Sequence, residues 1–279
     1  MNPVSSIKNI VAKALRICIG RKQLIRCGRF MGNAGMLRGP NDPRINGEFD
    51  YLAHVLDSSA VDSGNRPIVV DIGANLGVYS SHVSKLLNGQ GRVFAAEPCK
   101  ETMARLMQNT SNLPTKVEYL HVAFSDRDGN GRLFVVGSGA GTNSLEGEVT
   151  PTDNTENVTL LTLDSFLDRE SIDEIDFVKI DTEGHDLSVI RGAKRSLESR
   201  RIRALQFEYN WRWIGQRSFL KDVFAVIGGT DYHLGRVTPA GIEVLDSWNP
   251  SLETLIEDNY AVYRSDVSGQ LKLISYPAT

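Results

Sequence analysis

The chain has 279 residues and a formal net charge of −3, with 41% hydrophobic and 23% charged residues. These values are those of a globular protein with one large domain, and the charge gives no argument for a nucleic-acid partner. The three cysteines, Cys18, Cys27 and Cys99, form no CxxC pair and are odd in number, which argues against a disulfide framework or a zinc site. We therefore expect a cytoplasmic protein.

The first 45 residues differ in composition from the rest of the chain. They carry nine Lys or Arg residues against a single acid, Asp42. Apolar residues recur at helical spacing from Ile7 to Cys18, which predicts an amphipathic helix. Residues 28–47 are rich in glycine and contain two prolines, which predicts a loop or hinge. We expect a basic arm at 1–45 and the main domain at 46–279. The arm either caps that domain or contacts an anionic substrate or membrane surface, which would make the protein peripheral to the membrane.

The main domain alternates between helical and strand patterns. The expected elements are a helix at 49–56, a strand at 68–71, a helix at 78–87, a strand at 92–97, a helix at 101–109, strands at 117–124, 132–136, 158–163 and 176–181, a helix at 186–197, and strands at 202–208 and 259–264. The stretch 137–157 is rich in Gly, Thr and Asn and is expected to be mobile. Such alternation predicts a mostly parallel sheet covered by helices on both faces.

A glycine turn follows the strand at 68–71. It contains Asp71, Gly73, Ala74, Asn75 and Gly77, and the helix at 78–87 begins directly after it. A strand, a glycine loop and a helix N-terminus together form a nucleoside-binding unit. The acid before the first glycine would repel a pyrophosphate, but it suits a cationic ligand such as S-adenosylmethionine.

Several other strands also end in an acid. Glu97 ends the second strand, where a carboxylate is placed to bind ribose hydroxyls. Asp181 and Glu208 end two later strands. Because the carboxyl ends of parallel strands meet at one edge of a sheet, we expect these acids and Asp71 to surround one crevice.

The segment after the strand at 176–181 is dense in titratable groups. It holds Asp181, Glu183, His185 and Asp186 within six residues. Such a cluster is costly unless a function needs it. The alternative is helix capping, in which Asp181 or Thr182 caps the next helix and the acids favour its first turn.

These motifs together resemble one known family. The motifs are Asp71-Ile-Gly73-Ala74-Asn75-Leu-Gly77, Ala96-Glu97-Pro98, Thr162-Leu-Asp164 and Lys179-Ile-Asp181-Thr-Glu183-Gly184. Over about residues 68–210 their order and spacing are similar to those of the FkbM family of S-adenosylmethionine-dependent methyltransferases. The resemblance implies a class I methyltransferase fold, an α/β Rossmann-like three-layer sandwich. Its sheet would be mostly parallel and seven-stranded, with an antiparallel last strand.

The resemblance also implies roles for individual residues. The glycine turn, that is Asp71, Gly73, Ala74, Asn75 and Gly77, would line the amino-acid end of the cofactor. Glu97 would hold the ribose, and the stretch from Ala123 to Asp126 would lie along the adenine.

The reaction implied by the resemblance is O-methylation, which benefits from a base that removes the hydroxyl proton. The candidates are Asp181, Glu183, His185 and Glu208, and we rank Asp181 and Glu183 above His185. A less favoured alternative has Asp181 and Glu183 binding Mg²⁺, and we assign no residue as a metal ligand.

The expected acceptor is a small molecule or glycan, with a sugar or glycolipid hydroxyl favoured. Trp211, Trp213 and Trp248 suit a carbohydrate, although a role in the core suits them equally. The alternatives are a polyketide or other small natural product and, less favoured, a nucleic acid. The sequence leaves the oligomeric state open.

Overall fold

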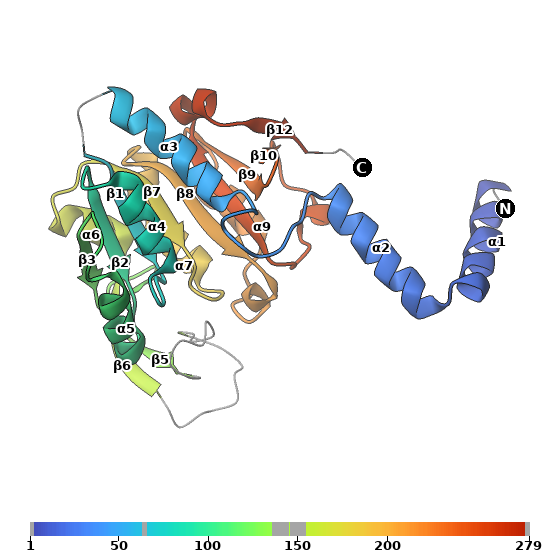
Figure 1. The fold of residues 1–279 in the computed structure, drawn as a ribbon, viewed down its shortest axis with the longest axis horizontal. Helices are drawn as coiled ribbons and strands as arrows, with labels where there is room; N and C mark the ends of the chain where they lie inside the picture. Colours follow the sequence, from blue (N-terminus) through green and yellow to red (C-terminus); the bar gives the residue numbers. More distant parts are fainter. Residues whose placement is uncertain (1–2, 63–65, 136–144, 146–154, 277–279) are drawn as a thin grey trace.

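The computed structural model describes residues 3–62, 66–135, 145 and 155–276. In these residues the chain forms a nine-stranded sheet covered by helices and a smaller three-stranded sheet (Figure 1). The order of the large sheet is β12-β10-β9-β11-β8-β7-β1-β2-β3. Its strands are β1 (Ile68–Ile72), β2 (Arg92–Ala96), β3 (Val117–Leu120), β7 (Ile175–Ile180), β8 (Ile202–Tyr209), β9 (Tyr232–Thr238), β10 (Gly241–Leu245), β11 (Asp258–Arg264) and β12 (Leu273–Ser275).

The strand directions are those of a class I methyltransferase. The neighbours β3, β2, β1, β7 and β8 are parallel. Next to them β11 is antiparallel to both β8 and β9. The seven strands from β3 to β9 therefore confirm the expected sheet with its antiparallel last strand. The expected number of strands was too low for the described part of the chain, because β10 and β12 extend the sheet beyond β9.

Helices cover both faces of the sheet. Neighbouring residues of a strand point to opposite faces, and Val69 and Val70 of β1 accordingly belong to two different apolar clusters. The cluster around Val69 includes residues of α3 (Glu48–Asp62), α4 (Val78–Leu87) and α5 (Lys100–Thr110). The cluster around Val70 includes residues of α6 (Leu163–Arg169), α7 (Asp186–Arg191), α8 (Lys194–Glu198) and α9 (Leu220–Ile227). Three short 3₁₀ helices are described: η1 (Trp211–Ile214), η2 (Pro250–Leu252) and η3 (Ser265–Gln270).

The expected strand at 117–124 is wrong as a single element. The chain leaves the large sheet after Leu120, and β4 (Ala123–Phe124) pairs instead with β6 (Thr155–Leu161) of the small sheet. The third strand of the small sheet is β5 (Gly129–Phe134), antiparallel to β6. The two sheets diverge at His121 and Val122, and Val122 lines a pocket between them. Of the stretch 137–157, residues 155–157 belong to β6; apart from residue 145, the remainder lies outside the described residues.

The expected helix at 186–197 is divided in two, α7 and α8. Between them lies Gly192, and a Cβ atom added there would approach the carbonyl oxygen of Ser125 to 2.0 Å. The carbonyl of Gly192 accepts a hydrogen bond from the Asp164 N–H (3.0 Å). The helix is therefore interrupted where it packs closely against the loop after β4.

The basic N-terminal arm contains two helices, α1 (Pro3–Cys18) and α2 (Arg21–Gly35). Helix α1 confirms that a helix forms where the sequence predicts one. The expected loop at 28–47 is wrong in its first part, because α2 continues to Gly35. Single glycines lower the stability of a helix but do not forbid it. Both helices extend away from the sheet (Figure 1).

Phe166 of α6 provides a test of the core. Its side chain is 2% exposed, and its ring contacts Phe94 and Phe124 edge-on, with centroid distances of 5.1 and 5.6 Å. We expect Phe166→Ala to lower the free energy of unfolding by about 3–5 kcal/mol, because it removes a large buried side chain and leaves a cavity. The matched control is Phe30→Ala on α2, where the side chain is 74% exposed and the change should stay within about 0.5 kcal/mol. Urea denaturation measures both, and equal effects would contradict the assigned core.

Candidate functional site

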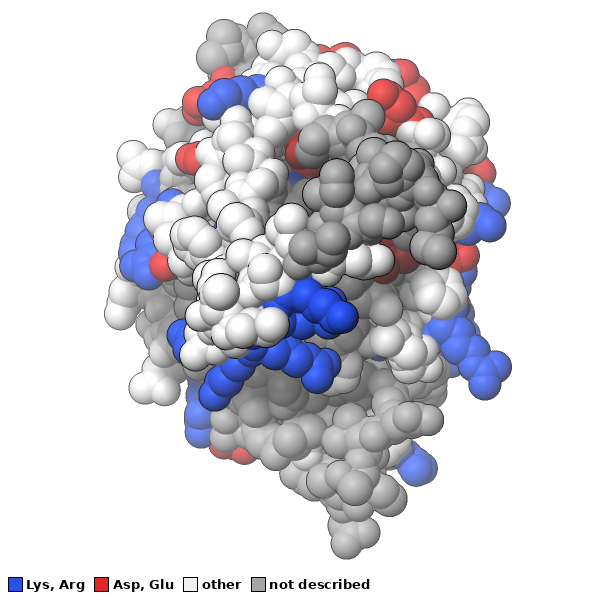
Figure 2. All heavy atoms as spheres, turned by 90° about the vertical axis from the view of Figure 1, so that its right-hand side faces the viewer, with Lys and Arg blue, Asp and Glu red and all other residues white. Residues whose placement is uncertain are grey.

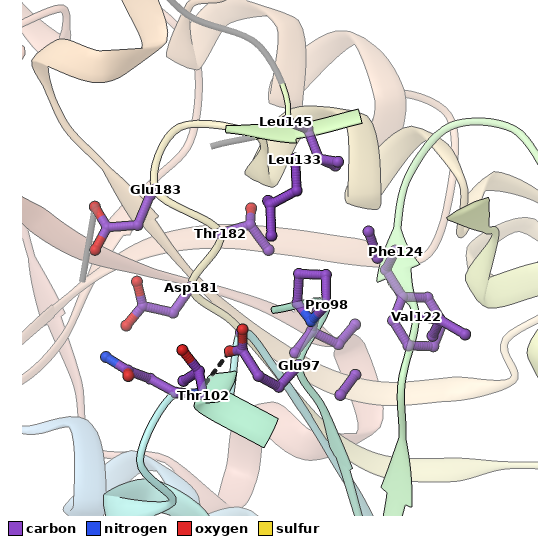
Figure 3. Close-up of a pocket in the computed structure, with 15 residues that line it drawn as sticks. Glu97, Pro98, Thr102, Val122, Phe124, Leu133, Leu145, Asp181, Thr182 and Glu183 are labelled. Carbon is purple, nitrogen blue, oxygen red and sulfur yellow. Dashed lines mark hydrogen bonds between the residues drawn. The ribbon is translucent and has the colours of Figure 1, made fainter. Parts of the chain in front are cut away.

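A pocket lies at the carboxyl ends of β1, β2 and β7. Its empty volume is about 710 Å³, part of which is open to solvent. Small-molecule sites typically have roughly 300–1,000 Å³. Figure 3 shows Glu97, Asp181 and Glu183 on one side of this pocket and the apolar residues Val122 and Phe124 on the other. The site is therefore polar on one wall and apolar on the opposite wall.

The glycine turn after β1 brings the backbone close to the end of β7. Gly73 has φ +81°, and an added Cβ atom would lie 1.8 Å from the carbonyl oxygen of Asp181. The N–H groups of Gly73 and Ala74 both donate to the carbonyl of Ala96 (3.0 Å each). Only a glycine allows the turn to come this close to Asp181. Gly73 itself lines the pocket, so the backbone of the turn is available to a ligand. Gly77, with φ +83°, caps the N-terminus of α4.

Glu97 follows β2 and is 5% exposed. Its Oε2 accepts from the N–H of Asn75 (3.1 Å), and its Oε1 accepts from the N–H of Cys99 (3.0 Å). Burial raises the pKa of Glu97 to about 7, although the two N–H donors act in the opposite direction. Additional donors from a ligand would stabilise the charged carboxylate.

Two buried polar atoms at the pocket have no partner among the described residues. They are Oδ1 of Asn75 and Oγ1 of Thr102, and both residues line the pocket. Buried polar atoms nearly always form hydrogen bonds. A polar ligand next to Glu97 would satisfy them, which fits the ribose and amino-acid parts of S-adenosylmethionine.

Residues of the small sheet and of the segments next to it form the apolar wall. Val122, Phe124, Leu133 and Leu145 line the pocket, as does Ala123. This surface suits a planar ring such as adenine. Asp126, which was expected beside Ala123, does not line the pocket; it is paired with Arg127 (3.2 Å).

Asp181 and Glu183 line the pocket, and each is paired with a cation. Asp181 Oδ2 lies 3.2 Å from Lys179 Nζ, and Glu183 Oε2 lies 3.1 Å from Arg212 Nε. Burial and the charge of Asp181 raise the pKa of Glu183 to about 7, whereas Arg212 lowers it. Glu183 also adopts the left-handed backbone conformation, with φ 55°. Such backbone strain is common at functional sites.

Other predicted site residues lie outside the pocket lining. Asp71 is 1% exposed and accepts from the Ser80 hydroxyl (2.5 Å), and burial raises its pKa to about 6.

Two candidate bases, His185 and Glu208, also lie outside the pocket lining. His185 Nε2 lies 2.9 Å from Ser125 Oγ. Glu208 Oε2 accepts from the amide of Asn210 (2.5 Å), and burial together with neighbouring acids raises the pKa of Glu208 to about 9. Ala74 and Gly77 belong to the turn but do not line the pocket.

Asp186 shapes the loop that carries Glu183. Its Oδ2 accepts from the Thr182 hydroxyl (3.1 Å) and from the N–H of Gly184 (3.2 Å), and its Oδ1 accepts from the N–H of Glu208 (3.3 Å). The side chain is 1% exposed, and burial raises its pKa to about 7. This acid therefore orders the turn rather than facing the pocket.

Sequence reasoning did not identify the cations of the site as functional. Lys179 is 4% exposed, and its Nζ also lies 3.7 Å from Glu48 Oε2. A lysine inside a buried strand, two residues before an acid, is the signal that could have been used, because a buried ammonium group needs a partner. Arg212 and Thr102 gave no comparable signal. No group of three or more His, Cys, Asp or Glu residues able to hold a metal is found among the residues that the structure describes.

The strand order and the pocket at the carboxyl edge define a class I methyltransferase fold. Residues 71–234 match the family described as Methyltransferase FkbM domain. This match covers more than half of the chain, which therefore belongs to the FkbM methyltransferase family. Members of this class use S-adenosylmethionine as methyl donor, and the residues around the pocket fit that cofactor.

A relative and two solved structures are similar to this chain. The relative is the hexuronic acid methyltransferase AglP of Haloferax volcanii, 27% identical over 158 residues, which are 56% of this chain and 60% of AglP. The chain thus matches less than two thirds of that relative. The methyltransferase FkbM of Methylobacillus flagellatus is 17% identical with a TM-score of 0.47, covering 76% of this chain and 47% of that one. The precorrin-6y C5,15-methyltransferase of Geobacter metallireducens is 14% identical with a TM-score of 0.40, covering 76% and 86%. Since both TM-scores are below 0.5, the fold assignment rests on this chain's own strand order.

Gly73 offers a test of the close approach between β1 and β7. We expect Gly73→Ala to lower the free energy of unfolding by about 4 kcal/mol or more, since the new methyl group would overlap the Asp181 carbonyl. Gly229→Ala is the matched control, because Gly229 also has a positive φ (+78°) but no neighbour within 4 Å. It should cost about 1–2 kcal/mol from backbone strain alone. Chemical denaturation compares the two variants, and indistinguishable losses would contradict the packing of the turn.

Proposed function

We propose that this protein is an S-adenosylmethionine-dependent O-methyltransferase that methylates a hydroxyl of a sugar, glycan or glycolipid. The observation that carries the proposal is the set of groups around one pocket: the Glu97 carboxylate and the buried polar atoms of Asn75 and Thr102, which have no partner among the described residues. They occur in a chain of a methyltransferase family. S-adenosylmethionine, when bound, supplies an electrophilic methyl group to the acceptor oxygen.

In this proposal the residues at β1 and β2 hold the donor. The Glu97 carboxylate accepts hydrogen bonds from the ribose hydroxyls, and the apolar wall with Ala123 packs along the adenine. The turn at Gly73 and Asn75 holds the amino-acid end. Asp71 acts through Ser80 and the turn rather than by direct contact, because it does not line the pocket.

The residues at the end of β7 serve the acceptor. Asp181 and Glu183 line the same pocket as the donor residues, so either can face a hydroxyl placed there. We assign the base to Glu183, because a pKa of about 7 lets it both accept and hold a proton near neutral pH. Asp181, held by the Lys179 ammonium group, orients the hydroxyl.

The proposed acceptor class draws on the relative and on two residues that follow β8, one of which, Arg212, pairs with the pocket residue Glu183. AglP is named for methylation of a hexuronic acid. In this chain Trp211 is 60% exposed, and the Arg212 guanidinium lies 5.0 Å from the centre of its ring. An exposed indole can stack on a sugar, and a guanidinium can bind a carboxylate. Trp213, in contrast, is fully buried and belongs to the core.

The donor site is tested with Glu97→Gln. We expect the dissociation constant of S-adenosylhomocysteine to rise about 10–100-fold, because the charge-assisted hydrogen bonds to the ribose are lost. Isothermal titration calorimetry measures the change. Glu118→Gln on the neighbouring strand β3 is the matched control, since Glu118 is paired with Arg92 away from the pocket. Equal affinities of Glu97→Gln and the wild type would refute the assigned donor site.

The base is tested with Glu183→Gln. With a hexuronic acid glycoside as acceptor and saturating S-adenosylmethionine, which keeps Glu97 charged, we expect wild-type kcat/KM to rise with pH through about 7 as the Glu183 carboxyl group loses its proton. Glu183→Gln should lower kcat about 10²–10⁴-fold and remove this rise, while affinity for S-adenosylhomocysteine stays unchanged. The companion variant Asp181→Asn should retain the pH dependence. If Asp181→Asn abolished it and Glu183→Gln did not, the two roles would have to be exchanged.

A further inference from the structure

The helices of the N-terminal arm expose apolar side chains. No residue of α2 is buried, and Ile25, Phe30 and Met31 are 47%, 74% and 66% exposed. On α1, Val11 and Ile17 are 50% and 83% exposed. Large apolar side chains exposed along a helix indicate a surface that becomes covered by a partner.

The same helices are strongly basic. From residue 1 to residue 41 the sequence contains no Asp or Glu, and the helices carry Lys8, Lys13, Arg16, Arg21, Lys22, Arg26 and Arg29. Figure 2 views the side from which the arm extends, and Lys and Arg atoms gather near its centre. A partner that covers this arm must therefore be both apolar and negatively charged.

The two properties of α2 are separated around its axis. At about 100° per residue, Leu24, Phe30 and Met31 lie on one half of the helix. The basic residues Arg21, Lys22, Arg26 and Arg29 lie on the other half, together with Ile25. A helix with one apolar face and one face rich in Lys and Arg suits the boundary between lipid headgroups and acyl chains.

The arm is attached at the edge of the sheet that carries the pocket. Arg38 donates to both carboxylate oxygens of Asp258 (3.0 and 2.9 Å from Nε), and Arg236 donates to the carbonyl of Met36 (2.5 Å). Asp258 begins β11 opposite Tyr209, the last residue of β8. The base of the arm is thus fixed at the carboxyl end of β8, next to the strands that form the pocket.

We propose that residues 1–45 form a membrane-binding arm whose helices lie on an anionic phospholipid surface, while residues 46–279 form the catalytic domain. The apolar face of α2 enters the boundary of the acyl chains, and its basic face binds the phosphate groups. A second copy of the arm is a poor partner, since two surfaces of the same charge repel each other. Among the residues that the structure describes, none of the helices could span a membrane.

This proposal is independent of the proposed function, because lipid binding requires no methyl transfer. If the proposed function also holds, the arm brings the pocket edge of the sheet to a lipid-linked sugar acceptor. Apolar burial and phosphate attraction would then act together to keep the enzyme at its substrate.

The test uses the full chain and vesicles of equal parts phosphatidylglycerol and phosphatidylcholine, compared with pure phosphatidylcholine, in a sedimentation assay. We expect binding to the anionic vesicles only, weakening as salt is added. The triple variant Lys22→Gln, Arg26→Gln, Arg29→Gln should lower the partition coefficient about 100-fold, from the loss of three headgroup contacts. The double variant Phe30→Ser, Met31→Ser should lower it roughly tenfold or more.

The matched control is Lys85→Gln, Lys116→Gln, Lys272→Gln, which removes the same charge from exposed positions on the catalytic domain. It should bind like the wild type. An equal loss in the control and arm variants would overturn the proposal, as would equal binding to neutral and anionic vesicles. Arm-dependent dimers in size-exclusion chromatography without vesicle binding would show instead that the arm binds a second copy. Since the substituted residues are exposed, the thermal unfolding midpoint should stay unchanged, which separates loss of binding from loss of folding.

Discussion

The buried ammonium group of Lys179 holds the acidic edge of the sheet together. It lies 3.2 Å from Asp181 and 3.7 Å from Glu48, and its charge also lowers the pKa values of Asp71 and Glu208. Burying a charge is costly unless partners compensate for it. Burial acts to lower the pKa of Lys179, but the surrounding carboxylates raise it overall, so the lysine stays charged. Without this cation, the carboxyl groups at the strand ends would repel one another.

This charge balance divides the acids into two groups. Asp181 and Glu183 reach the pocket, and each has a cation beside it. Asp186 and Glu208 are directed into the protein, and burial raises their pKa values to about 7 and about 9. Burial and the neighbouring acids therefore favour the neutral form of Glu208, which reduces the negative charge at the edge. Of the four strand-end acids expected around one crevice, Glu97 and Asp181 line the pocket, whereas Asp71 and Glu208 do not.

The sequence predicted the parts of the fold that are encoded locally. The strand, glycine turn and helix from Ile68 to Leu87, and the acid at Glu97, follow from apolar runs, glycine positions and spacing. The break at His121 was missed because the apolar pattern continues through it, and only tertiary pairing shows that β4 joins β6. For the same reason the sequence could not separate the acids lining the pocket from buried ones such as Asp186. Their residue types and distances along the chain are alike, whereas their hydrogen-bond partners differ.

The polar contacts around Glu48 connect the arm to the acidic edge. The chain passes from Arg38, which is paired with Asp258, to Glu48 at the start of α3. The Glu48 carboxylate accepts from the amides of Gln206 and Asn259 (2.5 and 3.0 Å) and also faces Lys179. Asn259 is the neighbour of Asp258 on β11. This strand therefore contacts the base of the arm through Asp258, and it contacts Glu48, the partner of Lys179, through Asn259. Buried hydrogen bonds of this kind restrict rotation. A surface that binds the arm would therefore meet the catalytic domain with its pocket edge in a defined orientation.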